Sequence, residues 1–141
     1  MRLGKNSKVD LIRHVPLFSA CSKSELAEIA SIADEIDLPE GKTLMEQGAA
    51  GREFFVLIEG TVDVTQNGQK VKSMGAGDFF GEIALVSKTA RTATVKTTSP
   101  VRALVINDRA FRALLEHSPQ IQLGVLQALA ERVAQHEPPP T

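Results

Sequence analysis

The sequence between residues 33 and 107 is a series of short β-type segments, each separated from the next by turn residues. Asn67-Gly68, the pair most typical of a tight β-hairpin, lies between two of them. A parallel sheet requires crossover connections of a dozen or more residues, and these turns leave no room for them. We therefore expect an antiparallel β-roll of sandwich or barrel (jelly-roll-like) type. Its predicted strands are residues 42–45, 53–58, 61–65, 69–74, 92–97 and 101–106.

Helical segments flank the predicted β-roll on both sides. Ser22-Lys-Ser-Glu25 is a capping-box pattern, in which a hydroxyl and a carboxylate satisfy free backbone N–H groups at a helix start. Asn107-Asp108 opens a second helical region, and Pro119 lies near the start of its last helix. We expect a mainly β protein with N-terminal helices at about 9–33, a β-roll at about 34–107, C-terminal helices at about 108–136 and a Pro-rich tail at 137–141.

Length and charge exclude several classes of protein. The chain has 141 residues, the size of one domain, which we assign to residues 1–136. Its 16 Lys and Arg residues against 17 Asp and Glu residues give a net charge of −1, which argues against duplex DNA as a ligand. The apolar runs are far shorter than the roughly 20 residues of a transmembrane helix. Without a secretory signal, and with Cys21 as the single cysteine, the chain is expected to be cytoplasmic.

The segment from Phe80 to Val95 contains the residues best suited to bind a ligand. Residues 82–86 favour a helical turn inside a β region, and the first N–H groups of such a turn lack partners and attract anions. Gly81 lets backbone approach a ligand closely, and Arg91 offers a planar, permanently charged fork that suits a phosphate. Glu82 is an acceptor for a sugar hydroxyl. Together these groups suggest a ligand that contains both a phosphate and a ribose. The three histidines are far apart in sequence, so no metal site is expected.

This segment resembles the phosphate-binding cassette of the cyclic-nucleotide-binding domain family, which includes the catabolite activator protein and the regulatory subunit of cAMP-dependent protein kinase. The matching residues are Phe80-Gly-Glu-Ile-Ala-Leu85 and Arg91-Thr-Ala-Thr-Val95. The resemblance continues in Val15-Pro-Leu-Phe18, in the hairpin region 55–64 and in Asp108-Arg-Ala-Phe111, and it covers about residues 10–136. One departure is Ala90, where the family often has Pro.

The resemblance implies a role for each matching residue. Glu82 would accept a hydrogen bond from the ribose 2′-hydroxyl, and Arg91 would pair with a phosphate oxygen. Backbone N–H groups near Ile83, Ala84 and Ala93, beside Gly81, would hold the remaining phosphate oxygens. Leu85 would transmit ligand binding to the C-terminal helices through its contact with Phe111. No catalytic residue, metal or further cofactor is implied, so the chain is expected not to be an enzyme.

The leading ligand on this reading is cAMP, and cGMP is possible because Thr92 offers a hydroxyl to a guanine. No aromatic residue follows Phe111, so the cap over the base is left open among Leu126, Leu129 and the stems of Arg132 and Gln135. The output would lie in a downstream protein or a fused effector domain, and this chain should not itself bind DNA. A homodimer through the helix at 121–133 remains possible. The alternatives are the excised or free-standing regulatory domain of a larger enzyme, transporter or transcription factor, and an interaction module that binds no nucleotide.

Overall fold

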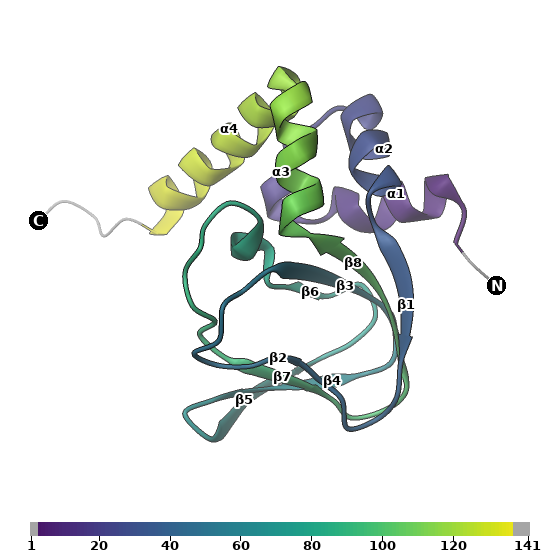
Figure 1. Cartoon of the computed structure of the whole chain (residues 1–141), viewed down its shortest axis with the longest axis vertical. Helices are drawn as coiled ribbons and strands as arrows, with labels where there is room; N and C mark the ends of the chain where they lie inside the picture. The colour runs from purple at the N-terminus through teal and green to yellow at the C-terminus, as the bar shows by residue number, and fades with distance from the viewer. Residues whose placement is uncertain (1–2, 137–141) are drawn as a thin grey trace, which may run out of the picture.

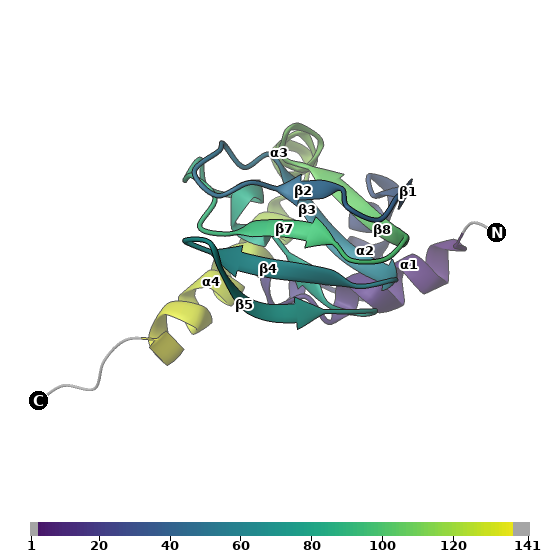
Figure 2. The ribbon, with the colours of Figure 1, turned by 90° about the horizontal axis from the view of Figure 1, so that it is seen from below.

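The computed structural model describes residues 3–136, apart from the side chains of Arg132, Gln135 and His136. Two four-stranded antiparallel sheets face each other, and all four α-helices gather at one end of them (Figure 1). The antiparallel β-roll with flanking helices is thereby confirmed. In order across the first sheet, the strands are β1 (Asp34–Leu38), β8 (Val101–Asn107), β3 (Glu53–Glu59) and β6 (Phe79–Phe80). Across the second they are β2 (Thr43–Met45), β7 (Thr94–Thr97), β4 (Val62–Gln66) and β5 (Gln69–Met74), which face the viewer in Figure 2.

The predicted hairpin at Asn67-Gly68 joins β4 to β5. Both turn residues have positive φ, 54° for Asn67 and 81° for Gly68, as a tight hairpin requires. Three details differ from the sequence prediction. The acidic strand β1 was missed because three of its five residues are carboxylates, and β6 is too short to show a period. The strand predicted at 92–97 begins only at Thr94, because Arg91 pairs instead with the loop before β3.

Two of the described helices, α2 (Lys23–Ser31) and α3 (Asp108–His117), begin with the side-chain caps that the sequence indicates. The other flanking helices are α1 (Lys5–Arg13), the 3-10 helix η1 (Pro16–Phe18) and α4 (Pro119–His136). The capping box at the start of α2 is confirmed: the Glu25 N–H donates to Ser22 Oγ at 3.2 Å, and the Ser22 N–H donates to Glu25 Oε1 at 2.6 Å. The Asn107 side chain accepts from the first N–H groups of α3. Helix α1 begins at Lys5, earlier than the predicted position 9, because polar residues fill its first turn.

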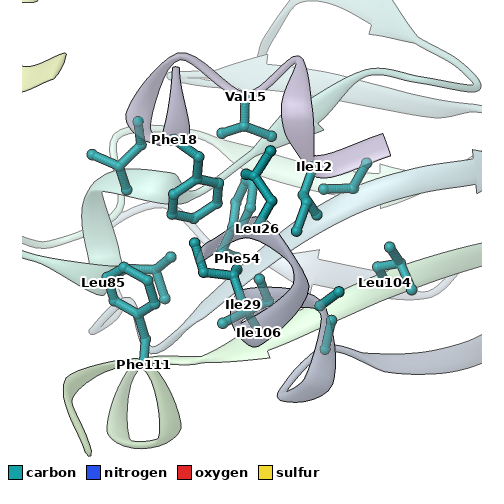
Figure 3. Close-up of a cluster of buried hydrophobic side chains, with 14 of the residues drawn as sticks. Ile12, Val15, Phe18, Leu26, Ile29, Phe54, Leu85, Leu104, Ile106 and Phe111 are labelled. Carbon is teal, nitrogen blue, oxygen red and sulfur yellow. The ribbon is translucent and has the colours of Figure 1, made fainter. Parts of the chain in front are cut away.

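Strand β3 separates two hydrophobic clusters, and its alternating side chains enter both. Phe54 and Val56 belong to a cluster built with the helices, which also contains Phe18, Leu85 and Phe111 (Figure 3). Phe55 and Leu57 belong to the second cluster, between the two sheets. Side chains of a strand alternate between its faces, so a strand covered on both sides must be apolar at successive positions. The run of residues 54–57 is therefore buried throughout.

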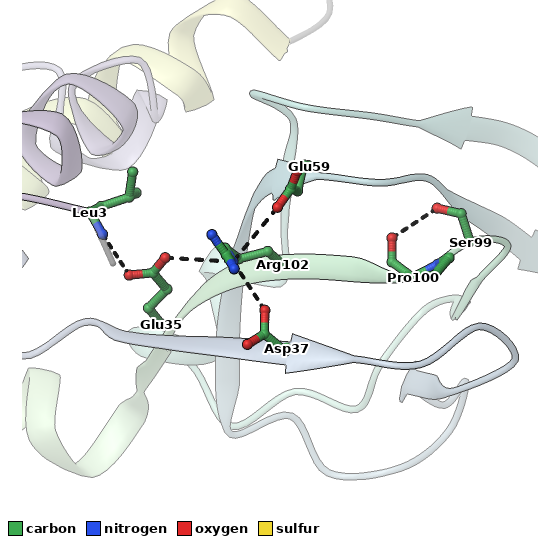
Figure 4. A network of polar contacts seen from close by, with 7 residues as sticks. All are labelled: Leu3, Glu35, Asp37, Glu59, Ser99, Pro100 and Arg102. Atoms are coloured by element: carbon green, nitrogen blue, oxygen red, sulfur yellow. Dashed lines mark hydrogen bonds and ion pairs between the residues drawn. The ribbon is translucent and has the colours of Figure 1, made fainter. Parts of the chain in front are cut away.

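A polar network ties the outer edge of the first sheet together (Figure 4). Arg102 Nε donates to Asp37 Oδ1 at 3.0 Å and lies 3.8 Å from Glu35 Oε1 and 3.7 Å from Glu59 Oε1. The other Glu35 oxygen accepts from the backbone N–H of Leu3 at 2.9 Å. The hydrogen bond and charge of Asp37 raise the pKa of Arg102. The network joins β1, β3 and β8 to the segment before α1.

Helix α4 packs on the rest of the molecule up to about Leu129. Ile121 and Val125 are buried, whereas Leu126 and Val133 are 64% and 66% exposed. The second half projects beyond the β-roll in both views (Figures 1 and 2). Among the helices described, none is both long and apolar enough to cross a membrane.

Candidate functional site

The candidate site lies in the connection between β6 and β7, residues 81–93. Gly81 opens it with φ 84°, a left-handed conformation that favours glycine. A Cβ at this position would lie 2.8 Å from Arg91 Nη1 and 2.8 Å from the carbonyl oxygen of Glu53. Gly81 therefore satisfies both a backbone conformation and a close approach. The short 3-10 helix η2 (Glu82–Leu85) follows directly.

The Arg91 guanidinium is enclosed by backbone atoms of three residues, to which it donates hydrogen bonds or with which it is in close contact. Its Nη2 donates to the carbonyl oxygen of Glu53 at 2.5 Å, and its Nη1 donates to the carbonyl oxygen of Gly81 at 3.4 Å. A Cβ on Gly51 would lie only 2.9 Å from Arg91 Cζ, so that glycine forms another wall of the slot. The Arg91 backbone is held as well, since its N–H donates to Ala49 and its carbonyl accepts from Gly48.

The electrostatics of the site place a carboxylate beside the guanidinium. Glu82 is buried, with 8% of its surface exposed, at the start of η2. Partial burial lowers the pKa of Arg91, while the Glu53 and Glu82 carboxylates act in the opposite direction. Arg91 stays charged at neutral pH because a guanidinium pKa starts so high. The structure thus brings together Gly81, Glu82 and Arg91, a cation and an acceptor nine residues apart in sequence.

The other predicted ligand residues lie around this centre. Ala84 and Ala93 are buried, and the Ala84 N–H donates to the Gly81 carbonyl oxygen at 3.1 Å. The side chain of Ile83 is 36% exposed, and the predicted contribution of this residue is its backbone N–H. Thr92 is exposed, and its carbonyl oxygen accepts from Gln66 Nε2 at 3.1 Å, which anchors the loop to β4.

The two predicted coupling residues belong to the same buried cluster. Leu85 and Phe111 are both fully buried, and η2 packs against α3 (Figure 3). The 3-10 helix of the candidate site and the first C-terminal helix are therefore in direct packing contact.

Sequence reasoning missed two features of the site. The Glu53 carbonyl oxygen holds Arg91, and Gly51 provides the space beside it. The turn at residues 48–51 is visible in the sequence, but nothing local shows that it pairs with Arg91, more than 40 positions later. That pairing arises only when the chain folds, through the bridge between Ala50 and Ala90.

A pocket beside α3 adjoins this site. It has a volume of about 730 Å³ and lies between α3 and the turn at residues 50–52, and none of the predicted ligand residues lines it. A second pocket, of about 290 Å³, lies around Arg102. Within residues 3–136 as described, no group of three His, Cys, Asp or Glu side chains is placed to hold a metal ion.

The family model of the cyclic nucleotide-binding domain matches residues 35–118, from β1 through α3 and including the whole cassette. The chain belongs to this family. The resemblance carried by residues 80–85 and 91–95 is confirmed at the level of the family, whose domains are regulatory.

Similar proteins come from several regulatory systems. The cAMP-dependent protein kinase regulatory subunit of Aspergillus fumigatus is 36% identical over 106 residues, which are 74% of this chain and 26% of that protein. A cGMP-dependent protein kinase, isozyme 2, of Drosophila melanogaster is 31% identical over 121 residues, 80% of this chain and 13% of that protein. A solved N-terminal domain of a transcriptional regulator from Streptomyces coelicolor A3(2) superposes with a TM-score of 0.82 at 27% identity, covering 91% of this chain and 95% of that one. The chain spans about a third or less of the length of the curated relatives it matches, including the two kinase proteins above.

Proposed function

We propose that this cyclic nucleotide-binding domain is a cAMP sensor whose ligand is held by Glu82 and Arg91. The observation that carries the proposal is the position of Arg91, whose charge lies beside Glu82 and whose guanidinium donates, among the described residues, to the carbonyl oxygens of Glu53 and Gly81. These two bonds use two of the five guanidinium N–H donors, so donors remain for phosphate oxygens. Glu82 supplies the acceptor for a ribose hydroxyl. The domain does no chemistry on its ligand.

The choice of cAMP rests on the relatives, and cGMP is the alternative. Relatives of comparable identity carry cAMP and cGMP in their names. Thr92 is exposed beside Arg91, so its hydroxyl is accessible to a guanine base. For the base cap, Leu126 is far more exposed than the half-buried Leu129, which makes Leu126 the better candidate of the two. Arg132 and Gln135 have side chains outside the described residues.

The proposed signal passes from η2 to the C-terminal helices. Regulation requires that cAMP bind one conformation better than another. Leu85 and Phe111 share one close-packed cluster, and such clusters tend to switch between discrete packings rather than deform smoothly. The two conformations we propose differ in whether the exposed half of α4 folds over the base.

The output of this sensor is proposed to lie in another protein or a fused domain. Its relatives are much longer than the chain, and the solved Streptomyces coelicolor domain is the N-terminal part of a transcriptional regulator. A regulatory domain of a larger enzyme, transporter or transcription factor is therefore the second candidate function. A cytoplasmic location follows from the same proposal and from the unpaired Cys21.

Calorimetric titration with cAMP and with cGMP tests the ligand assignment. Arg91→Ala is expected to weaken cAMP binding by about 100-fold or more, because each hydrogen bond to a charged group contributes about 1.5–3 kcal/mol. Arg91→Lys is also expected to bind poorly, since an ammonium offers no fork. Arg13→Ala, on the surface of α1, is the control and should bind as the unaltered chain does. Unchanged affinity in Arg91→Ala would refute the site, and equally weak binding of both nucleotides would favour the non-binding module.

A further inference from the structure

A second site candidate is the pocket of about 730 Å³ beside α3. Its walls come from three separate segments: the turn at residues 50–52, Lys88 in the loop after η2, and the outer face of α3 from Asn107 to Glu116. None of Gly81, Glu82, Ala84 or Arg91 lines it. Gly51, which borders Arg91, and Lys88, in the loop of the nucleotide site, do line it, so the pocket adjoins that site on its outer side.

The pocket is positively charged although the chain as a whole is not. Four cations, Arg52, Lys88, Arg109 and Arg112, line it together with two carboxylates, Asp108 and Glu116. Arg112 Nη1 pairs with Asp108 Oδ2 at 3.6 Å across one turn of α3. No ion pair within the described part of the chain involves the other three cations. The chain has a net charge of −1, so this local excess of positive charge is a concentrated feature of one surface.

The character of the lining decides which kind of ligand fits. Small-molecule sites are mostly apolar, with a few fixed polar groups. Here the lining is mainly charged, and Arg52, Lys88 and Arg109 are all exposed. Such hydrated, exposed cations provide no closed cradle for a small phosphate. Cations spread over three segments instead match acidic side chains spaced along an extended peptide.

We propose that this pocket docks an acidic segment of a partner protein. Carboxylates of the segment would pair with Arg52, Lys88 and Arg109. Exposed ion pairs contribute little individually, so docking rests on several of them acting together and is expected to be weak and sensitive to salt. This proposal does not depend on which nucleotide the cassette binds.

Fluorescence anisotropy with a fluorescein-labelled peptide of alternating Glu and Ser tests the proposal on the intact chain. At about 50 mM salt the peptide is expected to bind, and binding should fall steeply as salt is raised. Arg109→Glu and Arg52→Glu should each weaken binding at least tenfold. Arg109 is exposed in the first turn of α3, where an acidic residue is favourable to the helix, so this change should leave the fold intact.

Two controls separate docking from other causes. Lys72→Glu makes the same charge change at an exposed position on β5, outside the pocket lining, and should leave peptide binding unaltered. Arg91→Ala should also retain it, so failure of the nucleotide site and failure of this pocket are distinguishable. The proposal is overturned if the peptide does not bind, or if Lys72→Glu weakens binding as much as Arg109→Glu. Tighter binding of inorganic pyrophosphate or duplex DNA that depends on Arg52 would likewise overturn it in favour of a phosphate ligand.

Discussion

The position of Arg91 depends on two neighbouring residues that have no Cβ atom. The guanidinium lies between two glycines, Gly51 and Gly81, and a Cβ on either would come within 3.0 Å of it. Gly81 is also required by its positive φ, whereas Gly51 has an ordinary φ and is constrained only by the close approach. A substitution at Gly51 therefore tests whether nucleotide affinity depends on the exact position of the Arg91 guanidinium.

Gly51→Ala is expected to weaken cyclic nucleotide binding about tenfold or more, because the new methyl group displaces the guanidinium from its slot. The free energy of unfolding should change little, since the far end of a flexible side chain can move away. Gly75→Ala is the matched control: its Cβ would meet nothing closer than 3.9 Å, and its φ is also ordinary. Calorimetry would measure both affinities. An unchanged affinity in Gly51→Ala would show that Arg91 needs no fixed position.

At the scale of elements, α4 is held by the close approach of its backbone to the N-terminal segment. Helix α4 packs against η1, and the Gly124 backbone lies close to Ala20 and Cys21, which follow η1. A Cβ there would lie 3.2 Å from Cys21 Sγ. Burial, with a smaller contribution from the Glu25 charge, raises the pKa of Cys21 from 9.0 to about 11. The thiol is therefore a local reporter of the docking of α4.

Gly124→Leu is expected to lift the first half of α4 off η1 and to cost about 1–3 kcal/mol of stability. The thiolate is the reactive form, so loss of burial would lower the Cys21 pKa and accelerate alkylation at pH 8 by up to about 100-fold. In the unaltered chain the raised pKa disfavours the thiolate, and alkylation should rise about tenfold per pH unit until pH 11 is approached.

Iodoacetamide kinetics and urea unfolding measure the two effects. Gln127→Leu places the same side chain at an exposed position of α4 and should change stability by less than about 0.5 kcal/mol. If Gly124→Leu left the alkylation rate at the level of this control, Gly124 would not be the docking contact.

At the scale of the whole molecule, two hydrophobic clusters are joined through shared strands. Strand β3 sends Phe54 into the helical cluster and Phe55 into the cluster between the sheets, and β8 divides its side chains in the same way. Loss of one cluster removes support from the other. The domain should therefore unfold as one cooperative unit.

Phe111→Ala is expected to destabilise the whole domain by about 3–5 kcal/mol, because it opens a cavity at a fully buried position of the helical cluster. Urea unfolding measures the loss, and amide hydrogen exchange shows where it is felt. Backbone amides of β4, in the other sheet, should lose protection together with those of α3. Leu115→Ala, at a half-buried position of the same helix, should cost less. Protection retained in β4 and lost only in α3 would mean that the two clusters unfold separately.

The sequence predicted most of the fold because its signals are local. Local patterns predict the structure of a few neighbouring positions. Examples are the turn residues, the Ser22 capping box and the apolar run at 54–57. The missed elements are those in which long-range pairing outweighs local preference. The acidic strand β1 pairs with β8, and the two residues of β6 pair with β3.

The candidate site divides in the same way. Gly81, Glu82 and Arg91 and their spacing can be read from the sequence. The helical turn that follows Gly81 was also predicted from local residues. Tertiary structure alone decided that the Glu53 carbonyl and Gly51 form the slot for Arg91, and that Lys88 joins Arg52 and Arg109 around one pocket. The reason is physical. Backbone conformation follows from local sterics, whereas contacts between distant segments exist only after the sheets and the helices have packed.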